Sequence, residues 1–162
     1  MQNTENPYAA PTSKTYDVPS VAEGEKRKLF SPTQGGVGAF FFGPLTALYL
    51  MQSNFAAMAL HEKRTKTITY GAIFIVAFLL LSPFLPEKIP GFAIGLVYMY
   101  ITHAVIEKQQ MAKQKIIDSD MYEFQSNWLV FGIGLLGMLI LTVILMIILM
   151  AYSALGLIEP LW

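Results

Sequence analysis

The chain has 162 residues, of which 54% are hydrophobic and 14% are charged, and its formal net charge is zero. A soluble domain has about 25% charged residues, so this composition is typical of a membrane protein. The balanced charge gives no indication of nucleic-acid binding. The absence of cysteine excludes thiol catalysis, disulfides and cysteine-based metal sites.

Residues 1–28 are polar and rich in proline, and we expect a disordered cytoplasmic tail. The tail has no apolar core followed by a cleavage site, so we expect it to be retained. One stretch has the proline spacing of an extended recognition peptide with a tyrosine anchor. It consists of Asn6, Pro7, Tyr8 and Pro11. We predict tail docking here, with an unselected flexible leader as the alternative.

Residues 29–60 form an apolar segment with interruptions. Ser31 and Pro32 predict a helix start, with the serine as N-cap and the proline at the first helical position. Gly43 and Pro44 then predict a break. Three polar residues follow at 52–54 and cover about 200° of a helix circumference, so they cannot all avoid lipid. We therefore expect 29–60 to be a re-entrant or interfacial segment.

Three later segments, 68–85, 91–106 and 128–152, are apolar and long enough to cross a bilayer. The polar stretch 107–126 between the last two predicts a cytoplasmic loop with a surface helix. The expected fold is an all-α membrane protein with three transmembrane helices plus one re-entrant or interfacial helical segment. Residues 29–162 would form the helical membrane domain.

The distribution of Lys and Arg distinguishes three crossings from four. Four basic residues lie in the tail, three follow residue 60, three lie within 107–126, and Lys88 stands alone between the first two crossings. If 29–60 turns back, ten of the eleven lie on one side, as the positive-inside rule expects for the cytoplasm. If 29–60 crosses, five basic residues lie on one side of the membrane and six on the other, so the charges indicate no orientation. We predict a bacterial inner-membrane protein with a cytoplasmic N-terminus and a periplasmic C-terminus, with four transmembrane helices as the alternative.

Small residues on two predicted spans permit close helix packing in lipid. They are Gly91, Gly95, Gly132, Gly134 and Gly137. They predict either packing between the second and third crossing helices or an interface with another subunit.

His103 and Glu107 form a polar pair four residues apart near the end of a span. Such a pair can relay a proton or bind a metal, and His61 and Glu62 are the obvious additional ligands. The plainer interpretation is two interfacial residues that reach headgroup water. We expect no cofactor and no metal.

The N-terminal third carries several short motifs. The tail peptide reads Asn-Pro-Tyr-Ala-Ala-Pro, and further on come Ser31-Pro32-x-Gln34, Phe42-Gly43-Pro44-Leu45 and Asn54. In these motifs the chain resembles small uncharacterised bacterial inner-membrane proteins with an Asn-Pro-Tyr-x-Ala-Pro-like tail. The resemblance implies a multi-pass membrane protein and brings no established activity or site.

The predicted spans contain no central Asp, Glu, Lys or Arg, and the chain has no nucleophile–base set or phosphate-binding loop. We therefore predict a non-enzymatic accessory or scaffold subunit of a membrane complex, with the bilayer and other membrane subunits as partners. One alternative is a small homo-oligomeric channel or transporter in which 29–60 forms a pore loop. Another is a lipid-modifying or metal enzyme around His61, Glu62, His103 and Glu107.

Overall fold

The computed structural model describes residues 25–86 and 88–158, and the structure is 77% helical. The α-helices are α1 (Pro32–Phe42), α2 (Pro44–Ala57), α3 (His61–Leu81), α4 (Gly91–Val105), α5 (Lys113–Ile117) and α6 (Asn127–Ala154). A 3₁₀ turn, η1 (Ser82–Phe84), extends α3, and a π-helix, η2 (Ile106–Gln110), extends α4. Two short strands are β1 (Arg27–Leu29) and β2 (Tyr122–Phe124). The predicted tail peptide Asn6, Pro7, Tyr8 and Pro11 lies outside the described residues.

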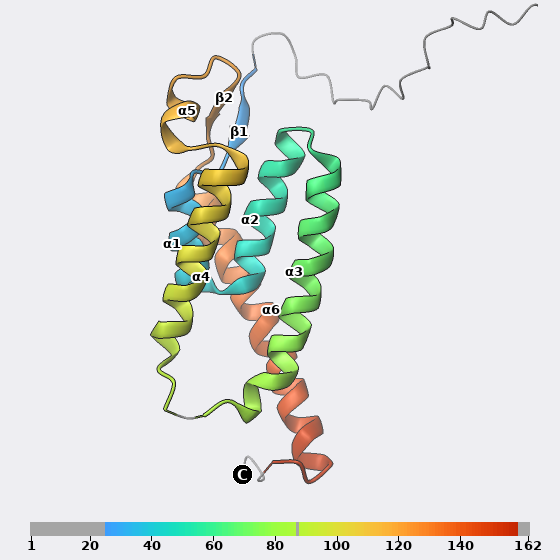
Figure 1. Ribbon diagram of the computed structural model, residues 1–162. Helices are drawn as coiled ribbons and strands as arrows, with labels where there is room; N and C mark the ends of the chain where they lie inside the picture. Colours follow the sequence, from blue (N-terminus) through green and yellow to red (C-terminus); the bar gives the residue numbers. More distant parts are fainter. Residues whose placement is uncertain (1–24, 87, 159–162) are drawn as a thin grey trace, which may run out of the picture.

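α1 and α2 form a short antiparallel hairpin that turns back inside the bundle. In Figure 1, α1 descends from the end that carries β1 and β2, and α2 returns to that same end. The two helices have 11 and 14 residues, or about 17 and 21 Å of helix. α3, α4 and α6 run past the hairpin to the opposite end of the molecule.

The ends of the hairpin follow from local sequence. The predicted start of α1 is confirmed, because Ser31 is the N-cap and Pro32 the first helical residue. Ser31 and Gln34 form a capping box, which satisfies two backbone N–H groups that the helix leaves free. At the tip, Gly43 adopts φ +81° and ψ −168°, a conformation open essentially to glycine alone. Pro44 then begins α2, so the structure places the helix break at Gly43.

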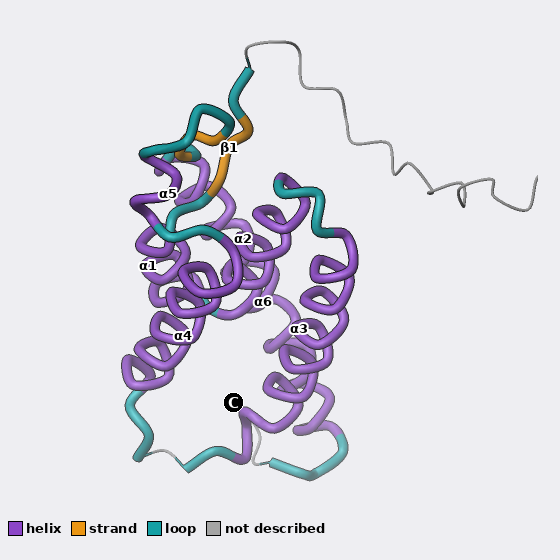
Figure 2. Tube along the Cα trace, turned by 45° about the horizontal axis from the view of Figure 1, so that its top comes forward, coloured by secondary structure: helices purple, strands orange, loops and turns teal. Residues whose placement is uncertain are grey.

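The hairpin fills the space between the long helices. α1 packs chiefly against α4 and also contacts α6, whereas α2 packs against α3 and α6. Phe30, Leu50 and Val130 form the apolar core beside it. Figures 1 and 2 show that α3 and α4 lie on opposite sides of the hairpin. The two helices contact each other where the Tyr98 ring packs edge-on against Phe74 and Phe78.

The polar end of the molecule differs from the expected fold. β1 pairs in parallel with β2, with Arg27 opposite Tyr122, so the predicted tail 1–28 already has regular structure at its last residues. The expected loop 107–126 contains η2, α5 and β2. A three-residue strand has no periodicity to detect, and this pairing joins residues that lie far apart in the sequence. The fold is therefore mostly helical, with one small sheet.

Two helices are long and apolar enough to cross a membrane. They are His61–Phe84, which combines α3 with η1, and Asn127–Ala154, and only 11% of the most apolar window of each is buried. The core helix of a soluble protein would bury most of its apolar residues, and these two do not. α4 has 15 residues, so it falls short of this length by itself.

Charge is segregated along the bundle axis. The Lys and Arg residues of the described part lie in or beside β1, in the first two turns of α3, and in the stretch from η2 to α5, with one exception. These segments share the end at which the hairpin begins and finishes (Figure 1). The exception, Lys88, lies in the α3–α4 connection at the opposite end.

Candidate functional site

A buried amide, Asn54, ties the hairpin to its surroundings. The Asn54 side chain is 2% exposed, and its Oδ1 accepts a 2.8 Å hydrogen bond from the Phe30 backbone N–H. Its Nδ2 donates to the Phe30 carbonyl at 2.8 Å and to Gln110 Oε1 at 2.7 Å. Gln110 in turn donates to the Met51 carbonyl. One side chain thus links the entry to α1, the last turns of α2 and the π-helix that follows α4.

A second amide, Gln34, connects α1 to α6. Besides accepting from the Ser31 N–H, the Gln34 side chain donates to the Gln125 carbonyl and to Asn127 Oδ1, both at 2.7 Å. The hairpin is therefore anchored at its base by two polar clamps that face different helices. We call Asn54, Gln110 and Gln34 with their partners the polar clamps.

Basic side chains complete the base of the hairpin. The Arg27 guanidinium donates to the Ala57 carbonyl at 3.0 Å, which satisfies an acceptor left free at the C-terminal end of α2. Lys28 lies 3.5 Å from Glu123 across the small sheet. The Lys28–Glu123 ion pair is half exposed, so it contributes little to stability.

Three of the five predicted packing glycines contact the hairpin. A Cβ at Gly95 would lie 3.1 Å from the Phe40 ring, one at Gly137 would lie 2.9 Å from Thr46 Oγ1, and one at Gly134 would overlap the Phe42 ring. These three glycines of α4 and α6 therefore pack against the hairpin, and they do not bring α4 and α6 into contact with each other. Gly91 and Gly132 have open space around them.

The outward face of α1 lies between two cavities. Val37 and Phe41 are 45% and 65% exposed on this face. A cavity of about 640 Å³ lies beside the contact between α1 and α6, and Gln34, Val37 and Phe131 are among its lining residues. A second cavity of about 490 Å³ lies beside the contact between α1 and α4, and His103 and Glu107 line it. Their side chains pair at 3.4 Å between Nδ1 and Oε2.

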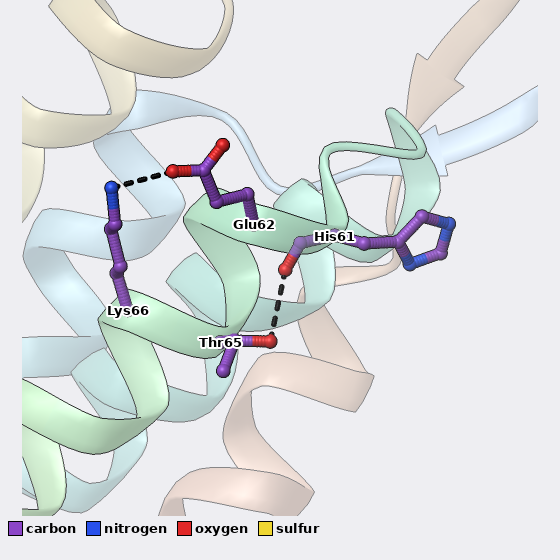
Figure 3. A network of polar contacts seen from close by, with 4 residues as sticks. All are labelled: His61, Glu62, Thr65 and Lys66. Atoms are coloured by element: carbon purple, nitrogen blue, oxygen red, sulfur yellow. Dashed lines mark hydrogen bonds and ion pairs between the residues drawn. The ribbon is translucent and has the colours of Figure 1, made fainter.

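His61 and Glu62 do not join that pair in a metal site. Figure 3 shows Glu62 directed toward Lys66, with 2.6 Å between carboxylate and ammonium, while the His61 carbonyl accepts from the Thr65 hydroxyl. Within the described ranges, no three His, Asp or Glu side chains gather closely enough to hold a metal ion.

The polar clamps were not among the residues predicted as a site. In sequence, Asn54 is one of three polar residues in an apolar segment, and only its place in the motifs of the N-terminal third distinguishes it. Within the described residues, those motifs cover the cap at Ser31 and Gln34, the tip at Gly43, and Asn54, and these residues shape the hairpin.

Comparison of the chain with protein family models, curated proteins and solved structures finds no match.

Proposed function

We propose that this chain is a polytopic protein of a bacterial inner membrane in which α3, α4 and α6 cross the bilayer and α1–α2 is re-entrant. The length of the hairpin supports this topology, since neither α1 nor α2 can span a hydrocarbon core of about 30 Å. α4 continues into η2, and together they run from Gly91 to Gln110. The hairpin packs against three helices, and such protein contacts are what non-helical backbone at membrane depth requires.

The positions of the basic residues support the orientation. With the basic end of the bundle in the cytoplasm, Lys88 alone lies on the periplasmic side among the described Lys and Arg residues. This arrangement agrees with the positive-inside rule. The N-terminus would then be cytoplasmic and α6 would end in the periplasm.

Within this topology, the chain acts as a non-enzymatic accessory or scaffold subunit of a membrane complex. The observation that carries this proposal is the outward face of α1, where Val37 and Phe41 stand exposed between two cavities. Close packing drives helix association in lipid. An exposed apolar helix face with a cavity on each side offers a partner helix extensive contact. The tail, with its predicted docking peptide, would add a cytoplasmic contact.

The channel or transporter alternative is less well supported. A pore loop normally presents carbonyls or polar side chains to the conduction path. The tip of this hairpin is formed by Phe41, Phe42, Gly43 and Pro44, and the cavity beneath it is lined mainly by apolar residues. Ion flux through proteoliposomes of the purified protein would revive this alternative.

Substitution on the outward face tests the proposal. We expect the full chain, tagged at native expression and extracted in mild detergent, to co-purify with a membrane partner. Val37→Trp places a large side chain on the outward face of α1, where it should obstruct the partner helix. We expect the amount of partner recovered to fall at least tenfold. Ile73→Trp on α3 is the matched control, because Ile73 is also exposed, at 61%, and lies away from α1. Recovery of the wild-type chain as a lone monomer, or equal loss of the partner in both variants, contradicts the proposal.

A further inference from the structure

The cavity of about 490 Å³ beside the contact between α1 and α4 is charged at one end and apolar at the other. Glu107 and Lys108 of η2 line it at the basic end of the bundle, together with His103 from the last turn of α4. Farther along the two helices, Val37 and Met99 line it. Charged and apolar lining residues thus succeed one another along the bundle axis, as a headgroup and an acyl chain do in a phospholipid.

The two charges at this end do not neutralise each other. Glu107 Oε2 lies 3.4 Å from His103 Nδ1, and Oε1 of the same carboxylate has no partner in the described part of the chain. Lys108 makes no ion pair within those residues either. Both side chains are exposed, so both can reach a bound molecule. A carboxylate oxygen and an ammonium that share a cavity without pairing are complementary to a ligand that carries both charges.

The level of these charges indicates what kind of ligand this is. α4 and η2 together run from Gly91 to Gln110, about 30 Å of helix, which is close to the thickness of the hydrocarbon core. In the topology proposed above, which this inference assumes, Glu107 and Lys108 then lie at the level of the cytoplasmic headgroups. The apolar end of the cavity lies within the hydrocarbon.

We propose that this cavity binds one phospholipid of the cytoplasmic leaflet whose headgroup carries a primary ammonium, as in phosphatidylethanolamine. The ammonium donates a hydrogen bond to Glu107 Oε1, and the phosphate accepts one from Lys108 Nζ, so both bonds are charge-assisted. The hydroxyl of Thr33, which also lines the cavity, is a further donor for the phosphate. One acyl chain lies along Val37 and Met99.

Other phospholipid headgroups match these charges less well. A phosphatidylglycerol has no cation, so its phosphate would lie near the Glu107 carboxylate without a compensating bond. A phosphatidylcholine carries a quaternary ammonium, which has no N–H to donate and is typically held in a cage of aromatic rings. The aromatic lining residue, Tyr100, lies about two helical turns from Glu107 and forms no such cage.

Native mass spectrometry of the full chain in mild detergent tests this assignment. The probes are three phospholipids with identical dioleoyl chains and an ethanolamine, choline or glycerol headgroup, added as an equimolar mixture. We expect the chain to bind the ethanolamine lipid roughly two- to tenfold more than either of the other two. Equal binding of the three lipids, or a preference for the glycerol lipid, overturns the proposal. The assay needs no partner protein, so its failure leaves the accessory role standing, and recovery of a lone monomer on co-purification leaves this site standing.

Two variants separate the roles of the two charges. Glu107→Gln keeps the size of the side chain and removes its charge, so binding of the ethanolamine and choline lipids should become nearly equal. Lys108→Gln removes the phosphate contact, so binding of all three lipids should fall together, roughly two- to tenfold. Glu62→Gln and Lys113→Gln are the matched controls, because they make the same charge changes at the basic end outside this cavity. An unchanged ethanolamine preference in Glu107→Gln, or equal losses in Lys108→Gln and Lys113→Gln, would refute the site.

Discussion

At the scale of single residues, Asn54 makes a network of three hydrogen bonds at the base of the hairpin. Its amide uses both donor positions and its acceptor on buried backbone and Gln110. A buried polar group costs little when all its bonds are made and much when a partner is removed. In a bundle with few buried apolar residues, such a group has a large share of the stability.

Removal of the Asn54 amide should therefore destabilise the protein strongly. Asn54→Leu keeps the branching at Cγ, is larger than Asn, and leaves the Phe30 N–H and carbonyl without partners, so we expect a loss of about 2–4 kcal/mol. Thermal unfolding in mild detergent would measure it as a lowered Tm. Ser53→Ala is the neighbouring control and should change the Tm little. Similar Tm values for both variants would show that Asn54 does not hold the base.

The glycines of α6 should separate into two classes under the same substitution. Gly134→Ala places a methyl group into the Phe42 ring, and we expect a destabilisation of about 1–3 kcal/mol. Gly132→Ala, two residues earlier, meets nothing and gains up to about 1 kcal/mol of helix propensity. The two Tm values should move in opposite directions. A stabilised Gly134→Ala variant would mean that the hairpin does not lie against this face.

At the scale of elements, the hairpin is short because its two helices are separated by one residue with an unusual backbone. A Cβ at Gly43 would have room, with Leu141 3.8 Å away. The constraint is conformational, since φ +81° with ψ −168° is unfavourable for any residue with a Cβ.

Substitution of Gly43 should act through this backbone strain. We expect Gly43→Ala to destabilise the fold by about 1–3 kcal/mol, measured as a fall in Tm. Gly43→Asn should be no better, because the tolerance of Asn for positive φ is confined to the left-handed helical region. Rescue by Asn would place the tip in a different conformation and would change the position of the cavity beneath it.

At the scale of the whole molecule, the separation of charge along the bundle agrees with the geometry of the hairpin. The charge separation and the hairpin geometry both place the α2–α3 connection and the base of α1 at one end of the bundle, and Lys88 at the other end. The two arguments are independent, because one concerns helix lengths and the other concerns the translocation of basic loops.

Cysteine accessibility would test this topology directly, and the chain has no native cysteine to interfere. In intact cells, a membrane-impermeant maleimide should label Lys88→Cys and leave Thr65→Cys unlabelled. Permeabilised cells should label both, which is the control for accessibility. Labelling of Thr65→Cys in intact cells would mean that 29–60 crosses the bilayer, as in the four-helix alternative.

The sequence alone was sufficient for the helical class, the N-cap at Ser31 and two of the three expected spans, which lie in helices that are long and apolar enough to cross a membrane; the third expected span, 91–106, stays a prediction. Each is a local property, read from composition, periodicity or a capping pattern within a few residues. The break at Gly43 and Pro44 could also be predicted locally, from a glycine–proline pair inside an apolar run.

Only the tertiary structure decided what these elements contact. The roles of Asn54 and Gln34, the pairing of β1 with β2, and the burial of three glycines against the hairpin all join residues distant in sequence. The cavity under the tip likewise exists because three long helices extend beyond a short pair. Periodicity shows which residues are apolar, but in a membrane lipid-facing and protein-facing surfaces are both apolar, so the partner of each face is determined by packing in three dimensions.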